Sequence, residues 1–449
     1  MAPDGSDERP LAGIRVFELS IAIAGPTCGR YLAHFGADVI KVESRRNPDP
    51  VRVIGSAWVP FDDPSIGDAR PDTSPVINEF SAGKRSLGLD LKHPRGKEAA
   101  QRLLATCDVF LTNYSGPAVR ELGLDYDAVR GVRPDIVYVA MHAFGAITDA
   151  PYYDYVAWGP NQAPLTGLDD ITGYPGEPPA AIAAFGYPDY SSGIFAVIGT
   201  LAALEHRDDT GEGQLVDVSQ FDATVSLLGP FLIDHERNGT TPARTGNRLP
   251  WSAPEGVYPC RGDDRWVAIS ADTDEAWRAL AGVAGHPEWV DHARFANVEA
   301  RIANHDALDE AIASWTVGHT ADEVAAWLQA AGVAAGPVMD PPAMLADVHV
   351  ADRGFWLVGE QARVGPDLVT GLPIRLSATP GGIERAGPSL GEDNAAVLGD
   401  VCGYSDEAQA ALADAGAVFP MAAPDLRLRR PYLAWAPAAF PHLPWSTGA

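Results

Sequence analysis

The first half of the chain alternates short apolar runs with amphipathic segments. Apolar runs at residues 14–19 and 38–42 predict two strands, and residues 27–34 between them predict a helix. The alternation continues with a helix over 94–106, a strand over 108–112, a short helix over 126–131, a strand over 135–141, a helix over 190–205 and a strand over 215–219. Strands separated by helices favour a parallel sheet with helices on its faces. The pattern therefore predicts an α/β fold with a Rossmann-like parallel-sheet large domain.

Two polar segments interrupt this alternation. Residues 47–75 are rich in Pro, Asp and Ser and predict a long surface loop. Residues 149–179 are rich in Gly, Pro and Tyr and predict a largely irregular segment around an active site. The turn after the first predicted strand, residues 20–26, lacks the GxGxxG pattern of dinucleotide-binding folds. The sequence therefore gives no indication of an NAD site.

The pattern changes after about Asn238. Residues 257–269 predict a hairpin that turns at Gly262 and Asp263. Helices are predicted over 274–284, 304–316 and 321–331, which makes a smaller α+β domain. The predicted organisation is a disordered leader at 1–10, a large Rossmann-like domain at 11–238, a small α+β domain at 239–350, a return to the large domain at 351–418, and an unassigned tail at 419–449.

Composition narrows the function classes. The formal net charge of −27 opposes binding to nucleic acid or to an anionic membrane, because both rely on Lys and Arg. No apolar run approaches the roughly 18 residues of a membrane span, and the acidic N-terminus does not resemble a signal peptide. The four Cys residues are far apart and form no CxxC pair, which favours a cytoplasmic protein without a metal site.

One carboxylate stands out as a candidate nucleophile. Asp189 lies in the segment 184–193, directly before a long apolar helix, where it is predicted to cap the helix. A helix N-terminus favours negative charge, so the carboxylate is expected to be ionised. The turn predicted at 191–193 is a candidate source of backbone N–H donors for an oxyanion. An ionised Asp in such a place can act as a covalent catalyst.

Several motifs, in order and spacing, resemble those of the class III CoA-transferase (CaiB/BaiF) family, which includes formyl-CoA and carnitine CoA-transferases. The resemblance runs from about Leu11 to about Gly403 and rests on the segments 35–43, 83–92, 176–179, 210–219 and 390–392. In that family an Asp followed four residues later by Gly is the acyl-accepting nucleophile, a pattern that Asp189 and Gly193 match.

The resemblance implies a reaction and an assembly. CoA would move from an acyl-CoA donor to a free carboxylic acid through an aspartyl mixed anhydride and an aspartyl-CoA thioester. Coenzyme A is then a substrate, and no tightly bound cofactor is needed. The family fold is a homodimer of two interlocked rings, so a homodimer is expected here.

The resemblance also implies contacts to CoA at positions carried over from the family. These candidate CoA-binding residues are Ile23, Ala24, Ser44, Arg45, Leu89, Lys92, Asn113, Tyr114, Arg120 and His142. The chain departs from the family at 113–117, and Glu121 stands where an Arg is frequent. The phosphate contacts are therefore expected to move to Arg120, Arg45 or Arg46.

Two other functions stay open. One is an α-methylacyl-CoA racemase of the same fold, which needs two acid-base groups. Racemases resemble one another in a His-Asp dipeptide, and the matching dipeptide in this chain is Tyr153-Asp154. A non-catalytic CoA-binding protein is the second alternative, although such a protein need not retain Asp189.

Overall fold

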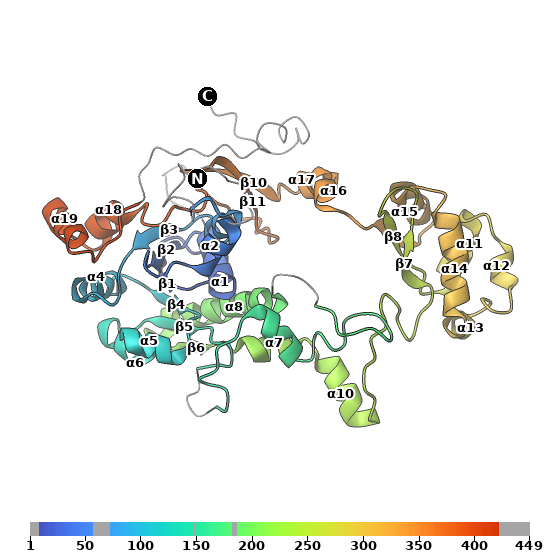
Figure 1. Cartoon of the computed structure of the whole chain (residues 1–449), viewed down its shortest axis with the longest axis horizontal. Coiled ribbons are helices and arrows are strands. Elements are labelled where there is room, and N and C mark those ends of the chain that lie inside the picture. Colours follow the sequence, from blue (N-terminus) through green and yellow to red (C-terminus); the bar gives the residue numbers. More distant parts are fainter. Residues whose placement is uncertain (1–8, 57–71, 147–149, 182–185, 422–449) are drawn as a thin grey trace. The chain divides into compact units, whose positions relative to one another are not determined.

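The computed structural model describes residues 9–56, 72–146, 150–181 and 186–421. The chain forms two compact units, drawn in Figure 1. The large unit comprises Met1–Thr166, Ala183–Pro230 and Asp347–Ala449, and the small unit comprises Gly167–Ile182 and Phe231–Ala346.

The large unit is built on a six-stranded parallel sheet in the order β3-β2-β1-β4-β5-β6. Its strands are β1 Arg15–Leu19, β2 Asp38–Glu43, β3 Arg85–Gly88, β4 Val109–Thr112, β5 Val137–Ala140 and β6 Leu215–Asp217. The order reverses between β1 and β4, as in doubly wound folds. The predicted α/β architecture with a parallel sheet is confirmed.

Helices cover both faces of this sheet. Phe17 on β1 and Phe110 on β4 pack in one core with α4 (Pro94–Leu104) and α6 (Tyr126–Val132). Their neighbours Val16 and Val109 pack in another core with α1 (Ala24–His34) and α8 (Tyr187–Thr210). Successive side chains of a strand point to opposite faces, so continuous apolar strands serve both cores at once.

Two helices lie where the sequence predicted irregular chain. Within the predicted loop 47–75, α2 spans Pro50–Ser56, and within 149–179, α7 spans Gly159–Leu165. The carboxylate of Asp49 accepts a hydrogen bond from the Val51 amide at 3.1 Å, and the amide of Trp158 donates to Asn161 at 2.6 Å. These end contacts support short helices whose composition alone is typical of loops.

The remaining elements of the large unit surround the sheet. They are α3 Pro75–Ser81, α5 Gly116–Leu122, α9 Gln220–Ser226, α17 Val348–Asp352, the hairpin β10 Trp356–Gln361 and β11 Gly365–Thr370, α18 Asn394–Ala396, a π-helical turn Val397–Val401 and α19 Asp406–Asp414. Helix α10, Gly229–Asn238, leads into the small unit.

The small unit packs helices against a three-stranded antiparallel sheet. The predicted hairpin is present as β7 Glu255–Pro259 and β8 Trp266–Ser270, and β9 Ala334–Pro337 joins β8. The helices are α11 Asp274–Val283, α12 Glu288–Asp291, α13 Val298–Ala303, α14 His305–Thr316, α15 Ala321–Ala330 and α16 Pro341–Ala346. Trp277, Leu280 and Leu308 are central to a separate hydrophobic core.

Candidate active site

A cavity of about 410 Å³ lies at the carboxyl ends of the central strands of the large unit. Ala22 follows β1, Asn113 follows β4 and His142 follows β5, and all three line it. Asp189, from the start of α8, lines it as well. In doubly wound folds the crevice at the reversal of strand order is where ligands bind. The cavity therefore lies at the site that the topology favours.

Asp189 lies inside the first turn of α8 rather than at its cap. The N-cap is Gly186, Pro188 occupies the first turn, and the Asp189 amide donates to the carbonyl of Gly186 at 3.0 Å. The prediction of an Asp cap is wrong because the helix begins at Tyr187, three residues earlier than expected. The predicted turn at 191–193 is likewise within the helix, where amides donate to carbonyls of the preceding turn.

Two glycines make room for the Asp189 carboxylate. A Cβ on Gly159 would lie 2.0 Å from Asp189 Oδ2, and one on Gly186 would lie 2.3 Å from the same atom. Gly193, one turn further along α8, approaches α1 so closely that its Cβ would meet Thr27 at 2.7 Å. The Asp-to-Gly spacing thus places Asp189 one helical turn before the close contact of α8 with α1.

Burial is the largest influence on the pKa of the Asp189 carboxyl. Only 8% of the residue is exposed, and desolvation raises the pKa of its carboxyl to about 7. The helix N-terminus opposes this shift, but burial outweighs it. The carboxyl that the sequence predicts to be ionised therefore holds its proton to a higher pH than an ordinary Asp.

His142 is a second buried polar group in the cavity. Only 6% of the residue is exposed, and neither ring nitrogen has a hydrogen-bond partner of good geometry among the described residues. Burial lowers the pKa of His142, although the Asp217 carboxylate opposes the shift. The imidazole is therefore neutral at pH 7 and has a ring N–H to offer a ligand.

The loop after β1 is held by contacts from three other segments. Asn113 accepts from the Ile21 amide and donates to the Ile21 carbonyl, both at 2.8 Å. Asp49 accepts from the Ala22 amide at 2.9 Å, and Lys41 donates to the Ser20 carbonyl at 2.7 Å. Ala22 has a φ of 60°, a left-handed conformation that costs energy for a residue with a side chain. These contacts hold the loop in that conformation beside the cavity.

A fully buried ion cluster lies under this loop, and sequence reasoning missed it. Lys84 contacts Glu18 at 2.7 Å, and Lys41 contacts Asp49 at 3.0 Å and Glu18 at 3.6 Å. The side chains of all four residues have an exposed fraction of 0%. Burial lowers the pKa of Lys84 to about 8, with Glu18 opposing the shift, so the ammonium stays charged at pH 7.

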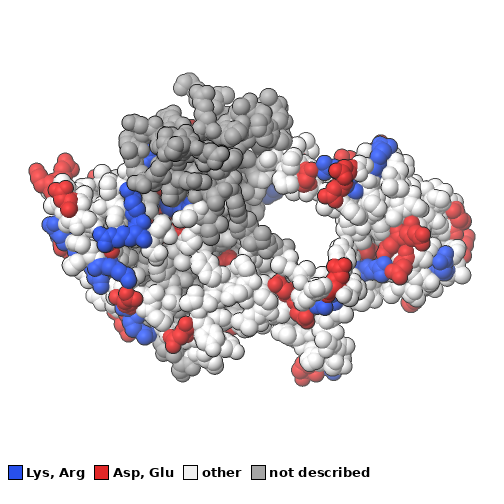
Figure 2. Space-filling model, viewed as in Figure 1, with Lys and Arg blue, Asp and Glu red and all other residues white. Residues whose placement is uncertain are grey.

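A second cavity of about 180 Å³ continues the first. The two share Asn47 and Tyr114 as lining residues. The sequence-predicted residues that line the second cavity are Ser44, Leu89, Lys92 and Tyr114, and Arg46 lines it too. Figure 2 shows Lys and Arg side chains gathered over the part of the large unit that carries α4. Together the two cavities form a groove that runs from Arg46 and Lys92 to Asp189.

Four of the predicted site residues lie outside the two cavities. Ile23 and Ala24 are buried at the start of α1, and Ile21 and Ala22 line the cavity in their place. The side chain of Arg45 donates to the carbonyl of Pro420. Arg120 lines a neighbouring cavity and donates to the hydroxyl of Tyr153 at 3.1 Å. The shift from 23–24 to 21–22 reflects the start of α1, which sequence pattern places only approximately.

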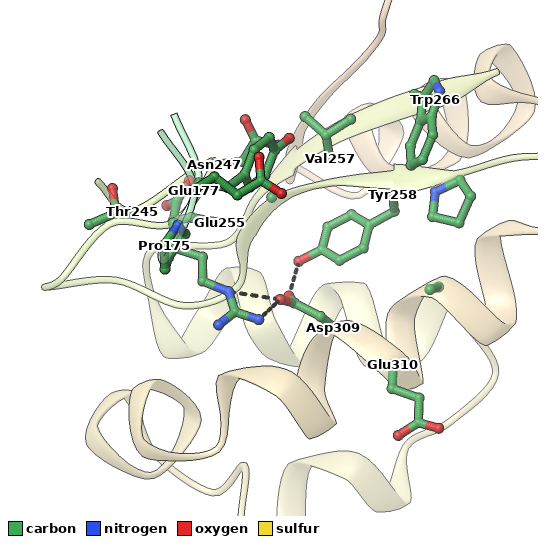
Figure 3. A pocket seen from close by; sticks show the side chains of 15 residues that line it. Pro175, Glu177, Thr245, Asn247, Glu255, Val257, Tyr258, Trp266, Asp309 and Glu310 are labelled. Atoms are coloured by element: carbon green, nitrogen blue, oxygen red, sulfur yellow. Dashed lines mark hydrogen bonds and ion pairs between the residues drawn. The ribbon is translucent and has the colours of Figure 1, made fainter. Parts of the chain in front are cut away.

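The small unit contains a larger cavity, of about 620 Å³, drawn in Figure 3. Three of its polar side chains are bonded to one another, with Asp309 accepting from Tyr258 at 3.0 Å and from Arg248 at 2.6 Å. No residue of the predicted site lines it. The network ties β7 to α14 and serves the packing of the small unit.

The comparisons with known proteins agree with the predicted resemblance. The family model described as CoA-transferase family III matches residues 11–394. The chain belongs to the CoA-transferase family III, and the resemblance seen in the sequence is confirmed. It is 33% identical over 399 residues to the succinyl-CoA–D-citramalate CoA-transferase of Chloroflexus aurantiacus, covering 89% of this chain and 96% of that protein. It is also 33% identical to the succinate–glutarate CoA-transferase of Agrobacterium fabrum, over 87% of this chain and 96% of that protein.

A solved structure supports the same family. The crystal structure of a CaiB/BaiF family protein from Brucella suis superposes with a TM-score of 0.77 at 29% identity, over 88% of this chain and 99% of that chain. This member of the CoA-transferase family III is therefore an enzyme of the CoA-transferase class. Within the described residues, no helix is long and apolar enough to span a bilayer.

Proposed function

We propose that this CoA-transferase family III member moves CoA from an acyl-CoA to a free carboxylic acid, with Asp189 as the covalent carrier. The observation that carries the proposal is the place of Asp189. It is buried, at the start of α8, at one end of a groove whose other end is lined by Arg46 and Lys92. The names of the relatives, all CoA-transferases, support the same reaction class.

The proposed reaction has four balanced steps. The Asp189 carboxylate attacks the thioester carbonyl, which forms an aspartyl–acyl anhydride and releases CoA thiolate. The thiolate attacks the aspartyl carbonyl, which forms an aspartyl-CoA thioester and releases the donor acid. The acceptor carboxylate attacks that thioester, which forms a second aspartyl–acyl anhydride and releases CoA thiolate. The thiolate then attacks the acceptor's carbonyl in this anhydride and releases the Asp189 carboxylate. The products are the new acyl-CoA and free Asp189, so one thioester replaces another of similar energy.

The groove suggests how CoA lies along it. The nucleotide would occupy the smaller cavity, beside Ser44, Leu89 and Lys92, and the pantetheine arm would pass Tyr114 toward His142. The neutral His142 ring can donate a hydrogen bond to the thioester or carboxylate oxygen. At the start of α8 the Gly186 and Tyr187 amides precede the first intrahelical donor, so they are candidate oxyanion donors.

Isotope exchange tests this function directly. The enzyme should move CoA from an acyl-CoA to a labelled free acid without ATP, and the product should be the labelled thioester, detected by mass spectrometry. Exchange of the substrate α-proton with deuterated water, without any acceptor acid, would instead support the racemase alternative. Binding of CoA with neither reaction would support a non-catalytic protein.

Arg46 should contribute more to CoA binding than Arg45. Arg46 lines the smaller cavity and lies 3.1 Å from Asp90, whereas Arg45 donates to the Pro420 carbonyl. Replacing Arg46 with Ala should weaken CoA binding by about 1.5–3 kcal/mol if the guanidinium bonds a phosphate. Calorimetry on R46A, R45A and R120A measures the three contributions. Affinity for a pantetheine thioester without the nucleotide should stay unchanged, and equal losses for both ligands would place the nucleotide elsewhere.

We further propose that the enzyme is a homodimer. Ile194, Ile198 and Leu201 follow one another at helical spacing along α8 and are 49%, 59% and 39% exposed. An apolar stripe of this kind on a surface marks a protein interface. Sedimentation at micromolar concentration should therefore give twice the mass of the chain, and a monomer would contradict the proposal.

A further inference from the structure

One wall of the cavity beside Asp189 is apolar and aromatic. Eighteen described residues line this cavity, and none of them is Lys or Arg. Tyr155, Val156 and Trp158 form one wall and are 60%, 71% and 47% exposed. Burying apolar surface is favourable, so exposed apolar surface that a ligand can cover favours an apolar ligand. This wall is therefore suited to an apolar group.

The wall is held in place by its own contacts. The ring of Tyr155 packs on Tyr152 with centroids 5.2 Å apart, and Tyr152 packs on Phe144 at 5.4 Å. The Tyr153 hydroxyl accepts from Arg120, and a Cβ on Gly116 would collide with that hydroxyl at 2.0 Å. A surface fixed in this way is a preorganised part of the site.

Two cationic side chains near the cavity, those of Lys41 and Arg120, already donate hydrogen bonds to other groups of the protein. Lys41 is buried and bonded to Asp49 and Ser20, and Arg120 bonds Tyr153 from the neighbouring cavity. The acids named for the two relatives, succinate, glutarate and citramalate, each carry two carboxylates. A second carboxylate against the wall of Tyr155, Val156 and Trp158 would lose its hydration without gaining a cationic partner.

We propose that the acid exchanged at Asp189 is an apolar monocarboxylic acid, aromatic or aliphatic, and not a dicarboxylic acid. This inference rests on the CoA-transfer function proposed above. One carboxylate of the acid reacts at Asp189, and the remainder of the acid lies against Tyr155, Val156 and Trp158.

Exchange between an acid and its own thioester tests the inference, because the reaction is thermoneutral for every acid. The pairs are butanoate with butanoyl-CoA, phenylacetate with phenylacetyl-CoA, and succinate with succinyl-CoA. Butanoate and succinate have the same chain length and differ in a terminal methyl or carboxylate. We expect kcat/KM for butanoate and phenylacetate to exceed that for succinate at least about tenfold. Succinate exchange as fast as butanoate exchange would overturn the specificity and leave the transfer function standing, whereas no exchange with any acid would overturn both.

A variant with an added cation sharpens the test. Val156→Arg places a guanidinium on the exposed wall, so the ratio of butanoate to succinate kcat/KM should fall at least about tenfold. Val348→Arg is the matched control, because Val348 is 75% exposed and lines neither cavity of the groove. Its ratio should equal that of the native enzyme. An unchanged ratio in V156R, or the same fall in both variants, would show that this wall does not select the acid.

Discussion

Replacing Asp189 with Asn should lower CoA transfer by roughly a thousandfold or more, because the amide cannot form the acyl anhydride. The fold and the affinity for CoA should be retained, since Asn fills the same space between Gly159 and Gly186. Asp169→Asn is a suitable control, because Asp169 is also poorly exposed, at 9%, and lines neither cavity of the groove. Initial rates with a saturating acyl-CoA measure the effect. Transfer by D189N at a near-native rate would show that another group is the nucleophile.

The same carboxyl should govern the pH dependence of the first half-reaction. Its pKa of about 7 means that kcat/KM for the acyl-CoA should rise with pH through about 7 and then level off. Folding favours the protonated form, because burial raises the pKa above its unfolded value. The contribution of this group to the free energy of unfolding is therefore fully present below its unfolded pKa of 3.8, and it is lost as the pH rises through about 7. D189N should lose this dependence and, because Gly186 is the cap, should not lose helix stability.

Replacing Lys84 with Met should be among the most destabilising single changes, with a loss of about 3–5 kcal/mol, because Glu18 would stay buried without its main partner. The two side chains are 2.7 Å apart and have no exposure. Urea denaturation measures the loss. The double variant K84M/E18Q should recover much of it, since the uncompensated charge is then removed.

Lys92 offers a matched control for this experiment. It forms a pair with Glu121 at 2.9 Å, but the two side chains are 73% and 69% exposed. Solvent screens such a pair, so Lys92→Met should change stability little. Equal losses for K84M and K92M would contradict the role given to the buried cluster.

Local pattern was sufficient for the framework of the fold. The strands β1, β2, β4 and β5 and the hairpin of the small unit all lie where alternation and turn residues predict them. Asn113 and His142, which the family resemblance offered as candidates, both line the cavity at the carboxyl ends of the strands. The proposal of Asp189 as the nucleophile needed the family motifs, since an Asp before an apolar helix is most often a cap.

The errors have physical causes that local pattern does not contain. The sequence Gly186-Tyr-Pro188 carries its own start signal, a Gly at the cap and a Pro in the first turn, which moves Asp189 one turn inward. Arg52 and Lys84 resemble surface cations in sequence. Only the folded chain brings Arg52 to Glu43 and Lys84 to Glu18, the latter across 66 residues.

Trapping the enzyme ester tests the central claim most directly. The enzyme is incubated with an acyl-CoA and then with hydroxylamine, which converts an aspartyl anhydride or thioester into a hydroxamate. Peptide mapping by mass spectrometry should place the modification on Asp189, in the peptide containing 188–190, and D189N should show none. Modification of another carboxylate, or an unmodified Asp189 while transfer proceeds, would contradict covalent catalysis by this residue.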